Sequence, residues 1–149
     1  SFDAITMSHV IEHVHDPVAL LKECYRILKP TGYLVAVTPN INSWGHKKFE
    51  ENWIHLDPPR HLHLFSDSTL RRCAIQAEVS NFSTLTTAAH SAHSFNASFD
   101  IQQFGHHVIS QETRRFNFLQ SLILQYREFF INQKKCNIGD VAVLICRKK

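Results

Sequence analysis

Two short apolar runs, Phe2 to Met7 and Tyr33 to Thr38, flank a stretch in which apolar residues recur at helical spacing. Apolar runs of this length are typical of strands that are covered on both faces, as in parallel sheets. Between them, Asp16 and Pro17 predict a helix start, and the turn Lys29-Pro30-Thr31-Gly32 predicts the helix end. The pattern therefore predicts a strand, a helix and a second parallel strand, joined by a right-handed crossover.

The apolar spacing is less regular after the second strand. Asn40 to Phe65 has no clean period, and we expect a long loop with about one helical turn. Ser66 then predicts the start of another helix, and Phe82 to Thr87 predicts a third strand. The apolar face of that helix carries Leu70, Cys73, Ala74 and Ala77.

The last third of the chain gives one strong helical signal. Ala88 to Ile109 is rich in His, Ser, Asn and Phe and predicts no clear element, so its histidines are expected to be solvated. Gln111 to Asn132 predicts an amphipathic helix, which suits a substrate lid, a dimer face or core packing. Val141 to Cys146 predicts a final strand. We expect one domain over residues 1–149, with a helical insertion at about 89–135.

Polar residues follow both predicted parallel strands. His9, Glu12 and His13 come after the first strand, and Asn40 and Asn42 come after the second. In an open parallel sheet, ligands bind just outside the carboxyl ends of the strands. The sequence therefore predicts a functional site at these residues.

Composition narrows the range of partners and compartments. The formal net charge is only +3, with acidic and basic residues interspersed, so no nucleic-acid partner is expected. There is no run long enough to span a membrane and no signal peptide. The four cysteines are far apart and form no CxxC pair, which favours thiols in a reducing, cytoplasmic compartment over a disulfide framework.

Several short sequence motifs in the first eighty residues are typical of one protein family. FDAITMSHVIEHVHDPVALLKECYRILKPTGYLVAVTPN, with its EHVHDP and LKPTG phrases, resembles the fourth strand, following helix and fifth strand of class I S-adenosylmethionine-dependent methyltransferases. The nearest branch by these phrases is that of the ubiquinone-biosynthesis O-methyltransferases. The later WIHLDPPRHLHLFSDSTLRRCAIQAEV is similar to a segment of the same broad group. The resemblance implies an α/β, Rossmann-like methyltransferase fold, mostly parallel with an antiparallel last strand, and S-adenosylmethionine as cofactor.

The family's front half has no counterpart in this sequence. Its glycine-rich loop is missing, since the only glycines are widely separated, and so is the acidic residue on its second strand. We therefore expect a truncated fold, the carboxyl-terminal half, without the first strands. The strand at Phe2 to Met7 would then lie at an edge, and we expect a second copy of the chain, or displaced residues of its own, to cover it.

The resemblance also implies roles for particular residues. It places Met7, Ser8 and His9 toward the methionine part of the cofactor, with Glu12 and His13 in the same cofactor-binding segment. In the ubiquinone branch, acidic residues and a histidine here can hold a divalent metal. The first of those acids is His9 in this chain, so we expect no metal.

His9 is instead a candidate general base, because a histidine titrates near neutral pH. His61, on the loop after the second strand, is a further candidate. The expected function is methyl transfer from S-adenosylmethionine to a small-molecule or carbohydrate-like acceptor, where proximity and orientation supply most of the catalysis.

Other interpretations remain open. HVIEH at residues 9–13 also fits the H-x-x-E-H zinc-peptidase pattern, but that pattern needs a continuous helix. The chain could be a non-catalytic scaffold that kept the fold. Trp44 and Trp53 either line an acceptor pocket or pin their loop to the sheet. A homodimer could form through the Phe2 to Met7 edge or through the helix at 111–132.

Overall fold

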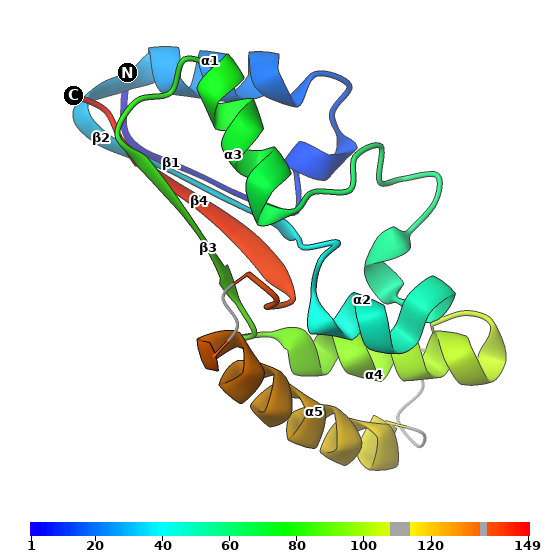
Figure 1. Ribbon diagram of the computed structural model, residues 1–149. Coiled ribbons are helices and arrows are strands. Elements are labelled where there is room, and N and C mark those ends of the chain that lie inside the picture. The colour runs from blue at the N-terminus through cyan, green and yellow to red at the C-terminus, as the bar shows by residue number, and fades with distance from the viewer. Residues whose placement is uncertain (108–113, 135–136) are drawn as a thin grey trace.

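The computed structural model describes residues 1–107, 114–134 and 137–149, with the side chains of residues 114–116 outside the description. The described residues form one four-stranded sheet with helices packed around it (Figure 1). The strands are β1 (Phe2–Ser8), β2 (Leu28–Pro39), β3 (Phe82–Thr87) and β4 (Val141–Arg147). The helices are α1 (Pro17–Ile27), α2 (Trp44–Phe49), α3 (Asp67–Gln76), α4 (Ser91–Phe104) and α5 (Arg114–Lys134).

The strand order is β1-β2-β4-β3. β1 and β2 pair in parallel through the α1 crossover, and β4 runs antiparallel to both of its neighbours. The predicted parallel unit and the predicted antiparallel last strand are therefore confirmed. Three strands point the same way, although β4 separates β3 from the other two.

Helix α1 begins and ends close to the predicted positions. The Asp16 carboxylate accepts a hydrogen bond from the Ala19 amide at 2.8 Å, and Pro17 occupies the first turn. β2 then begins at Leu28, before the predicted turn. Within it Thr31 adopts a φ of 65°, a conformation that favours glycine, and the pairing of β1 with β2 shifts register at this point.

One face of the sheet is covered by α1 and α3 (Figure 1). Leu34 and Ala36 of β2 and Leu144 of β4 are fully buried in that core. Tyr33, which lies between buried positions of β2, and Leu85, which lies between half-buried positions of β3, are both exposed. The expectation that the strands are covered on both faces is therefore wrong for the described chain, because the unbroken apolar runs conceal a period of two.

β1 lies at the edge of the sheet, as expected from the truncated fold. Among the described residues it pairs with β2 alone, and Phe2 is 55% exposed whereas Met7 is buried. The expectation that displaced residues of the same chain cover this strand is thus wrong for the described part. Coverage by a second copy remains a prediction.

Between β3 and β4 the chain forms α4 and α5, which lie side by side (Figure 1). α4 occupies the segment for which the sequence predicted no element, and its buried face carries Ser91, Ala92, Ser94, Phe95, Asn96, Ala97, Ser98 and Asp100. Small polar residues dominate this face, so no apolar period was visible. The histidines at His90, His93, His106 and His107 are exposed, as expected.

The predicted helix at 111–132 is confirmed as α5, and its predicted start lies outside the described residues. Its apolar side faces outward, because Leu119, Ile123 and Tyr126 are all more than 60% exposed, whereas Ser121 and Glu128 are buried. Plain core packing therefore does not account for that side, and the lid and dimer alternatives remain predictions.

The loop after β2 holds more structure than the single turn expected. It contains α2 and two short 3-10 turns, Glu50–Asn52 and Ile54–Leu56. Trp53 is buried in a second apolar cluster with Phe49 and Phe95, which supports the pinning role for this tryptophan.

The described cysteines Cys24, Cys73 and Cys146 are free, and Cys136 lies outside the described residues. None of the described helices combines the length and the apolar character that a membrane crossing requires.

Candidate active site

A histidine–carboxylate pair lies at the carboxyl end of β1. The His9 amide donates to the Val37 carbonyl of β2 at 2.9 Å, and its φ of 53° turns the chain out of the sheet. His9 Nδ1 then lies 3.2 Å from Glu12 Oε1. The Thr38 hydroxyl donates to Glu12 Oε2 at 3.0 Å. The ends of two parallel strands thus converge on one buried carboxylate.

The pair differs in exposure, and each partner changes the pKa of the other. The His9 side chain is 40% exposed, and that of Glu12 is 1% exposed. The contact with Glu12 raises the pKa of His9, and burial, which acts in the opposite direction, does not cancel that effect. Burial alone would raise the pKa of Glu12, but contacts with His9 and Thr38 outweigh it and leave that pKa below its usual value. The geometry favours a charged or proton-sharing pair.

A second histidine, His55, lies against the first. Its ring stacks on that of His9, with centroids 5.5 Å apart and planes inclined by 20°. His55 Nε2 is 2.8 Å from Ser94 Oγ of α4. The Ser94 hydroxyl in turn donates to Asp140 Oδ2, just before β4, at 2.7 Å. Four separate segments therefore meet at this point of the site.

His13 and His61 form another contact in the same region. Their rings meet edge to face at 4.7 Å. His13 Nδ1 lies 2.9 Å from the Arg60 carbonyl, and His61 Nδ1 lies 2.7 Å from the His55 carbonyl. The loop that carries His61 is held by the Glu12 carbonyl, which accepts hydrogen bonds from the next two backbone amides.

Glu12, His13 and His61 present atoms that a cation could bind, all within 4.8 Å of one another. A cation there would compete with His9 and Thr38 for the two oxygens of Glu12. The described geometry therefore fits the histidine–carboxylate pair better than a metal site. The expectation that no metal is used remains a prediction.

Two further carboxylates are buried beneath the site. Glu128 of α5 is fully buried, and Asp140 is 2% exposed. Burial, together with repulsion from Asp140, raises the pKa of Glu128 to about 8. Ser91 and the Gly45 amide lie near enough to oppose this effect, but neither forms a well-directed hydrogen bond with Glu128. Both oxygens of Glu128, and Oδ1 of Asp140, therefore have no hydrogen-bond partner in the described chain.

The remaining predicted residues have distinct placements. Met7 is buried and Ser8 is exposed at the end of β1, and no described contact tests their assignment to the cofactor. Asn40 is fully buried, and its side-chain amide donates to the Gly139 carbonyl at 2.8 Å, which gives it a structural role. Asn42 is exposed.

The helix that the zinc-peptidase pattern requires does not form. Residues Ile11–His13 make only a single 3-10 turn, and His9 precedes it in a left-handed conformation. His9 and Glu12 contact each other instead of sharing a ligand site on one helical face.

Sequence reasoning missed Ser94, Asp140 and Glu128, and it assigned no role to His55. No signal singled out Ser94 within its serine-rich segment. Glu128 did carry a signal, since it is the single acidic residue in the apolar-rich stretch from Phe116 to Ile131.

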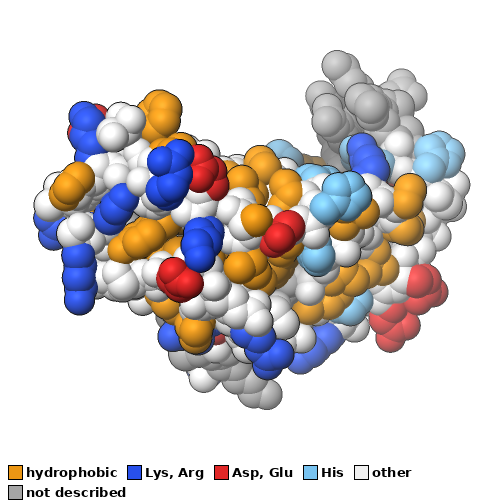
Figure 2. All heavy atoms as spheres, turned by 90° about the horizontal axis from the view of Figure 1, so that it is seen from above, with side chains coloured by type: hydrophobic (Ala, Val, Ile, Leu, Met, Phe, Trp, Pro, Cys, Tyr) orange, Lys and Arg blue, Asp and Glu red, His pale blue; other side chains and the backbone are white. Residues whose placement is uncertain are grey.

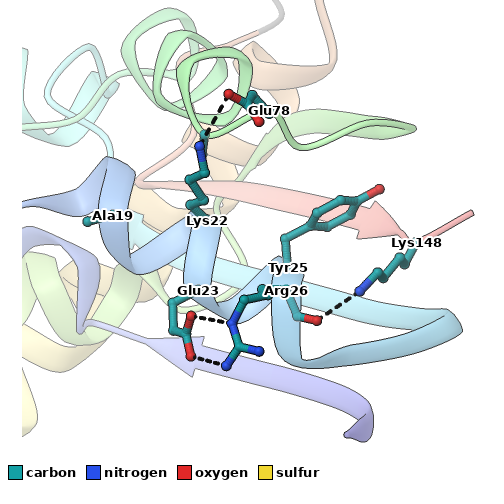
Figure 3. A pocket seen from close by; sticks show the side chains of 8 residues that line it. Ala19, Lys22, Glu23, Tyr25, Arg26, Glu78 and Lys148 are labelled. Carbon is teal, nitrogen blue, oxygen red and sulfur yellow. Dashed lines mark hydrogen bonds and ion pairs between the residues drawn. The ribbon is translucent and has the colours of Figure 1, made fainter.

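A separate hollow lies at the opposite end of the sheet. It measures about 560 Å³ and is lined mainly by residues of α1, with Glu78 and Lys148 (Figure 3). Each charged group there has a partner: Lys22 pairs with Glu78, Arg26 with Glu23, and Lys148 Nζ donates to the backbone carbonyls of Arg26 and Leu28. An anionic ligand would have to displace these partners.

Known proteins match the chain in its first half by sequence. The family model of a methyltransferase domain matches residues 1–84 of the 149. A ubiquinone biosynthesis O-methyltransferase from Xanthomonas oryzae pv. oryzae is 50% identical over 40 residues, which are 27% of this chain and 17% of that protein. A protein of the same description from Idiomarina loihiensis is 41% identical over 46 residues, or 30% of this chain and 19% of that protein.

Solved structures match along the whole chain. An S-adenosylmethionine-dependent methyltransferase from Thermotoga maritima has a TM-score of 0.56 at 21% identity, covering 100% of this chain and 56% of that one. Another, from Archaeoglobus fulgidus, has a TM-score of 0.55 at 18% identity, covering 98% of this chain and 59% of that one. These likenesses show the Rossmann-like α/β fold. The chain spans little more than half the length of either structure. With more than half of its residues matched by the family model, the chain belongs to the methyltransferase domain family, among the class I S-adenosylmethionine-dependent methyltransferases.

Proposed function

We propose that the chain forms the catalytic side of an enzyme that transfers a methyl group from S-adenosylmethionine to a small-molecule or carbohydrate-like acceptor. The observation that carries this proposal is the His9–Glu12 pair at the carboxyl end of β1, where ligands bind in open parallel sheets. Membership of the methyltransferase family supports the cofactor. The acceptor class rests on the sequence resemblance.

The described residues fit one part of that cofactor. Ser8 is exposed at the end of β1, beside His9, so polar groups are available for the amino-acid end of the molecule. A glycine-rich turn that could approach the remainder closely is not present, because Gly32, Gly45, Gly105 and Gly139 are far apart in the sequence. The proposal is therefore that this chain supplies the reacting side of the site.

Bound S-adenosylmethionine would supply an electrophilic methyl group. The residues of this chain would manage the proton of the acceptor. With Nδ1 of His9 directed at Glu12, the free nitrogen Nε2 can accept a proton, as in other histidine–carboxylate pairs. Glu12 would act as a positioning residue for the His9 ring, and the Thr38 hydroxyl would in turn hold Glu12.

The direction of the pH dependence follows from the raised pKa of His9. Below that pKa the ring carries a proton and cannot accept another. Transfer that uses His9 as the base therefore increases as the pH rises through the raised value.

The test combines calorimetry with transfer of a tritiated methyl group. S-adenosylmethionine would be titrated into a solution of the chain to measure its binding. Methyl transfer would then be measured to catechol, to an aliphatic primary amine and to a simple sugar. We expect His9→Gln to lower transfer by about 10²–10⁴-fold, the usual contribution of a general base. His90→Gln is the matched control, because His90 is exposed and its side chain forms no described hydrogen bond.

Absence of cofactor binding would contradict the proposal for this chain and favour the non-catalytic scaffold. Binding with equal transfer by wild type and His9→Gln would contradict the role of His9 while preserving the activity.

A further inference from the structure

We infer that His55 is a second proton acceptor of this active site, with Ser94 and Asp140 as positioning residues that fix which of its nitrogens is free. The inference rests on the proposed methyl transfer and extends it to a residue outside the family-like phrase that carries His9. It depends on three features of the described chain: a directed hydrogen-bond relay, the stacking of two rings, and partial access to solvent.

The relay determines the tautomer of His55. Asp140 Oδ2 is a carboxylate oxygen, so the Ser94 hydroxyl at 2.7 Å must be the donor in that contact. With its only hydrogen committed, Ser94 Oγ can only accept from His55 Nε2 at 2.8 Å. His55 therefore carries its proton on Nε2, and its Nδ1 retains a lone pair. Within the described residues, no group donates a hydrogen bond to that nitrogen.

The buried end of the relay keeps it in place. Asp140 is 2% exposed, and its Oδ2 is 3.5 Å from His55 Nε2, close enough to stabilise a positive charge on the ring. Ser94 is held by the α4 backbone, since the Ser98 hydroxyl donates to the Ser94 carbonyl at 2.7 Å. The His55 carbonyl accepts from His61, which fixes the backbone beside the ring. His55 is thus held at Nε2 by Ser94 and Asp140 and at its backbone by His61, so its ring loses little conformational freedom when it accepts a proton.

The charged and titratable groups around His55 define when it can act. His9 faces it from the end of β1, with Glu12 behind His9, and Asp140 faces it from the start of β4. Glu128 of α5 lies beyond Asp140, and His61 contacts the His55 backbone. Two stacked rings that both carried a proton would repel each other. The Glu12 carboxylate at 3.2 Å from His9 raises the pKa of that ring and favours its protonated form.

His55 Nδ1 is therefore a second nitrogen at this site that can accept a proton when His9 is protonated. The His55 side chain remains 16% exposed, so it is accessible from the site yet largely shielded from water.

The proposed step conserves atoms and charge. The acceptor's O–H or N–H proton moves to His55 Nδ1, and the acceptor's electron pair forms a bond to the methyl carbon. The carbon–sulfur bond breaks with its electron pair returning to sulfur, and His55 later releases the proton to water.

The first arm of the test reads the tautomer directly and needs no acceptor. Long-range ¹H–¹⁵N spectra of the histidine-labelled chain would be recorded at pH 7, with His55 assigned by comparison with His55→Gln. We expect the uncharged form of the His55 ring to carry its proton on Nε2. Ser94→Ala should produce a mixture of tautomers, and Ser94→Thr, which keeps the hydroxyl, should restore the single form. A ring protonated on Nδ1 in the wild type would overturn the inference.

The second arm measures methyl transfer against pH in the same panel of acceptors. We expect His55→Gln to lose about 10²–10⁴-fold while His9 is protonated, and to lose less as the pH rises through the raised pKa of His9. Cofactor binding by calorimetry should be unchanged, and His90→Gln should behave as wild type.

The two levels of failure are distinguishable. A chain that binds no cofactor and transfers no methyl group refutes the proposed function, and the role of His55 with it. An active enzyme in which His55→Gln shows a uniform loss at every pH, or no loss, overturns the inference about His55 alone.

Discussion

The two ends of the sheet treat charge in opposite ways. At the amino-terminal end of β2, the exposed side chains of Lys22, Glu23, Arg26 and Glu78 line the hollow of Figure 3 and form two ion pairs. At the carboxyl end, Glu12, Glu128 and Asp140 are each at most 2% exposed, and each has an oxygen without a hydrogen-bond partner in the described chain. Figure 2 shows the related surface difference, with histidines gathered among hydrophobic side chains toward one end and mixed Lys, Arg, Asp and Glu toward the other.

The difference shows which region carries a cost for stability. Exposed ion pairs gain little because water screens them, and they can be lost without consequence. A buried carboxylate without its full set of partners costs free energy that the rest of the fold must offset. Perturbed buried groups cluster at functional sites, which supports the proposal that the carboxyl end of the sheet carries the active site.

The largest expected effect concerns Glu128. Its pKa is raised to about 8, so between about pH 4.5 and pH 8 the folded state binds more protons than the unfolded state. The free energy of unfolding must then fall as the pH rises through this window, by on the order of 4 kcal/mol. Glu128→Gln should remove this slope and be more stable than wild type at pH 9, but not at pH 4. Urea unfolding at both pH values measures the difference.

Equal stability of Glu128→Gln and wild type at pH 9 would show that ionisation of Glu128 does not lower the free energy of unfolding. The contrast between the two ends of the sheet would then lose its main support. Gln120→Glu, at another position on α5, provides a control for a carboxylate introduced elsewhere on the helix.

An intermediate effect is expected at Thr38. Thr38→Val keeps the shape of the side chain but removes the hydroxyl that donates to Glu12 Oε2. The loss should lower the free energy of unfolding by about 1–3 kcal/mol at pH 7, because the buried carboxylate has no other described donor to that oxygen. The pKa of Glu12 is lowered in the folded state, so its stabilisation is present above its unfolded value and is lost as the pH falls.

Thr38→Val should therefore also unfold at a higher pH on acidification. Circular dichroism during acid titration measures this shift, and Thr84→Val on β3 is a control with a hydroxyl in a different setting. An unchanged acid midpoint would mean that Thr38 does not stabilise the charged form of Glu12.

The smallest effect is expected at the amino-terminal end. Arg26→Gln breaks a two-point contact with Glu23, but both side chains are more than half exposed. The urea midpoint should not move measurably, because solvent screens the pair. A clear loss of stability would show that the surface pairs contribute more than exposed ion pairs usually do.

The same contrast explains what could be predicted from the sequence. The β1–α1–β2 unit was predictable because its signals are local: Asp16 and Pro17 start the helix, and each apolar run has the length of a strand. His9 and Glu12 could be placed at one site because both follow directly on β1. Their contact with each other was not predicted, since it depends on the left-handed turn at His9.

The rest of the site depends on long-range packing. Ser94 and Asp140 lie 46 positions apart, and His55 lies 39 positions before Ser94. No period or motif links them, because α4 buries small polar side chains where an apolar stripe would be expected. The apolar pattern of α5 predicted the helix, but it could not show that this side faces outward, because the spacing of apolar residues does not say what covers them.

The position of β4 has a consequence for how the protein folds. Tyr33 pairs with Arg147 and Phe82 with Cys146, so β3 joins the other strands only through β4. The sheet cannot close until a segment distant in sequence inserts between strands formed earlier, and contacts of such long range slow folding. Until then the unpaired edges of β2 and β3 are exposed to other chains, so the interval before insertion is when this protein is most prone to aggregate.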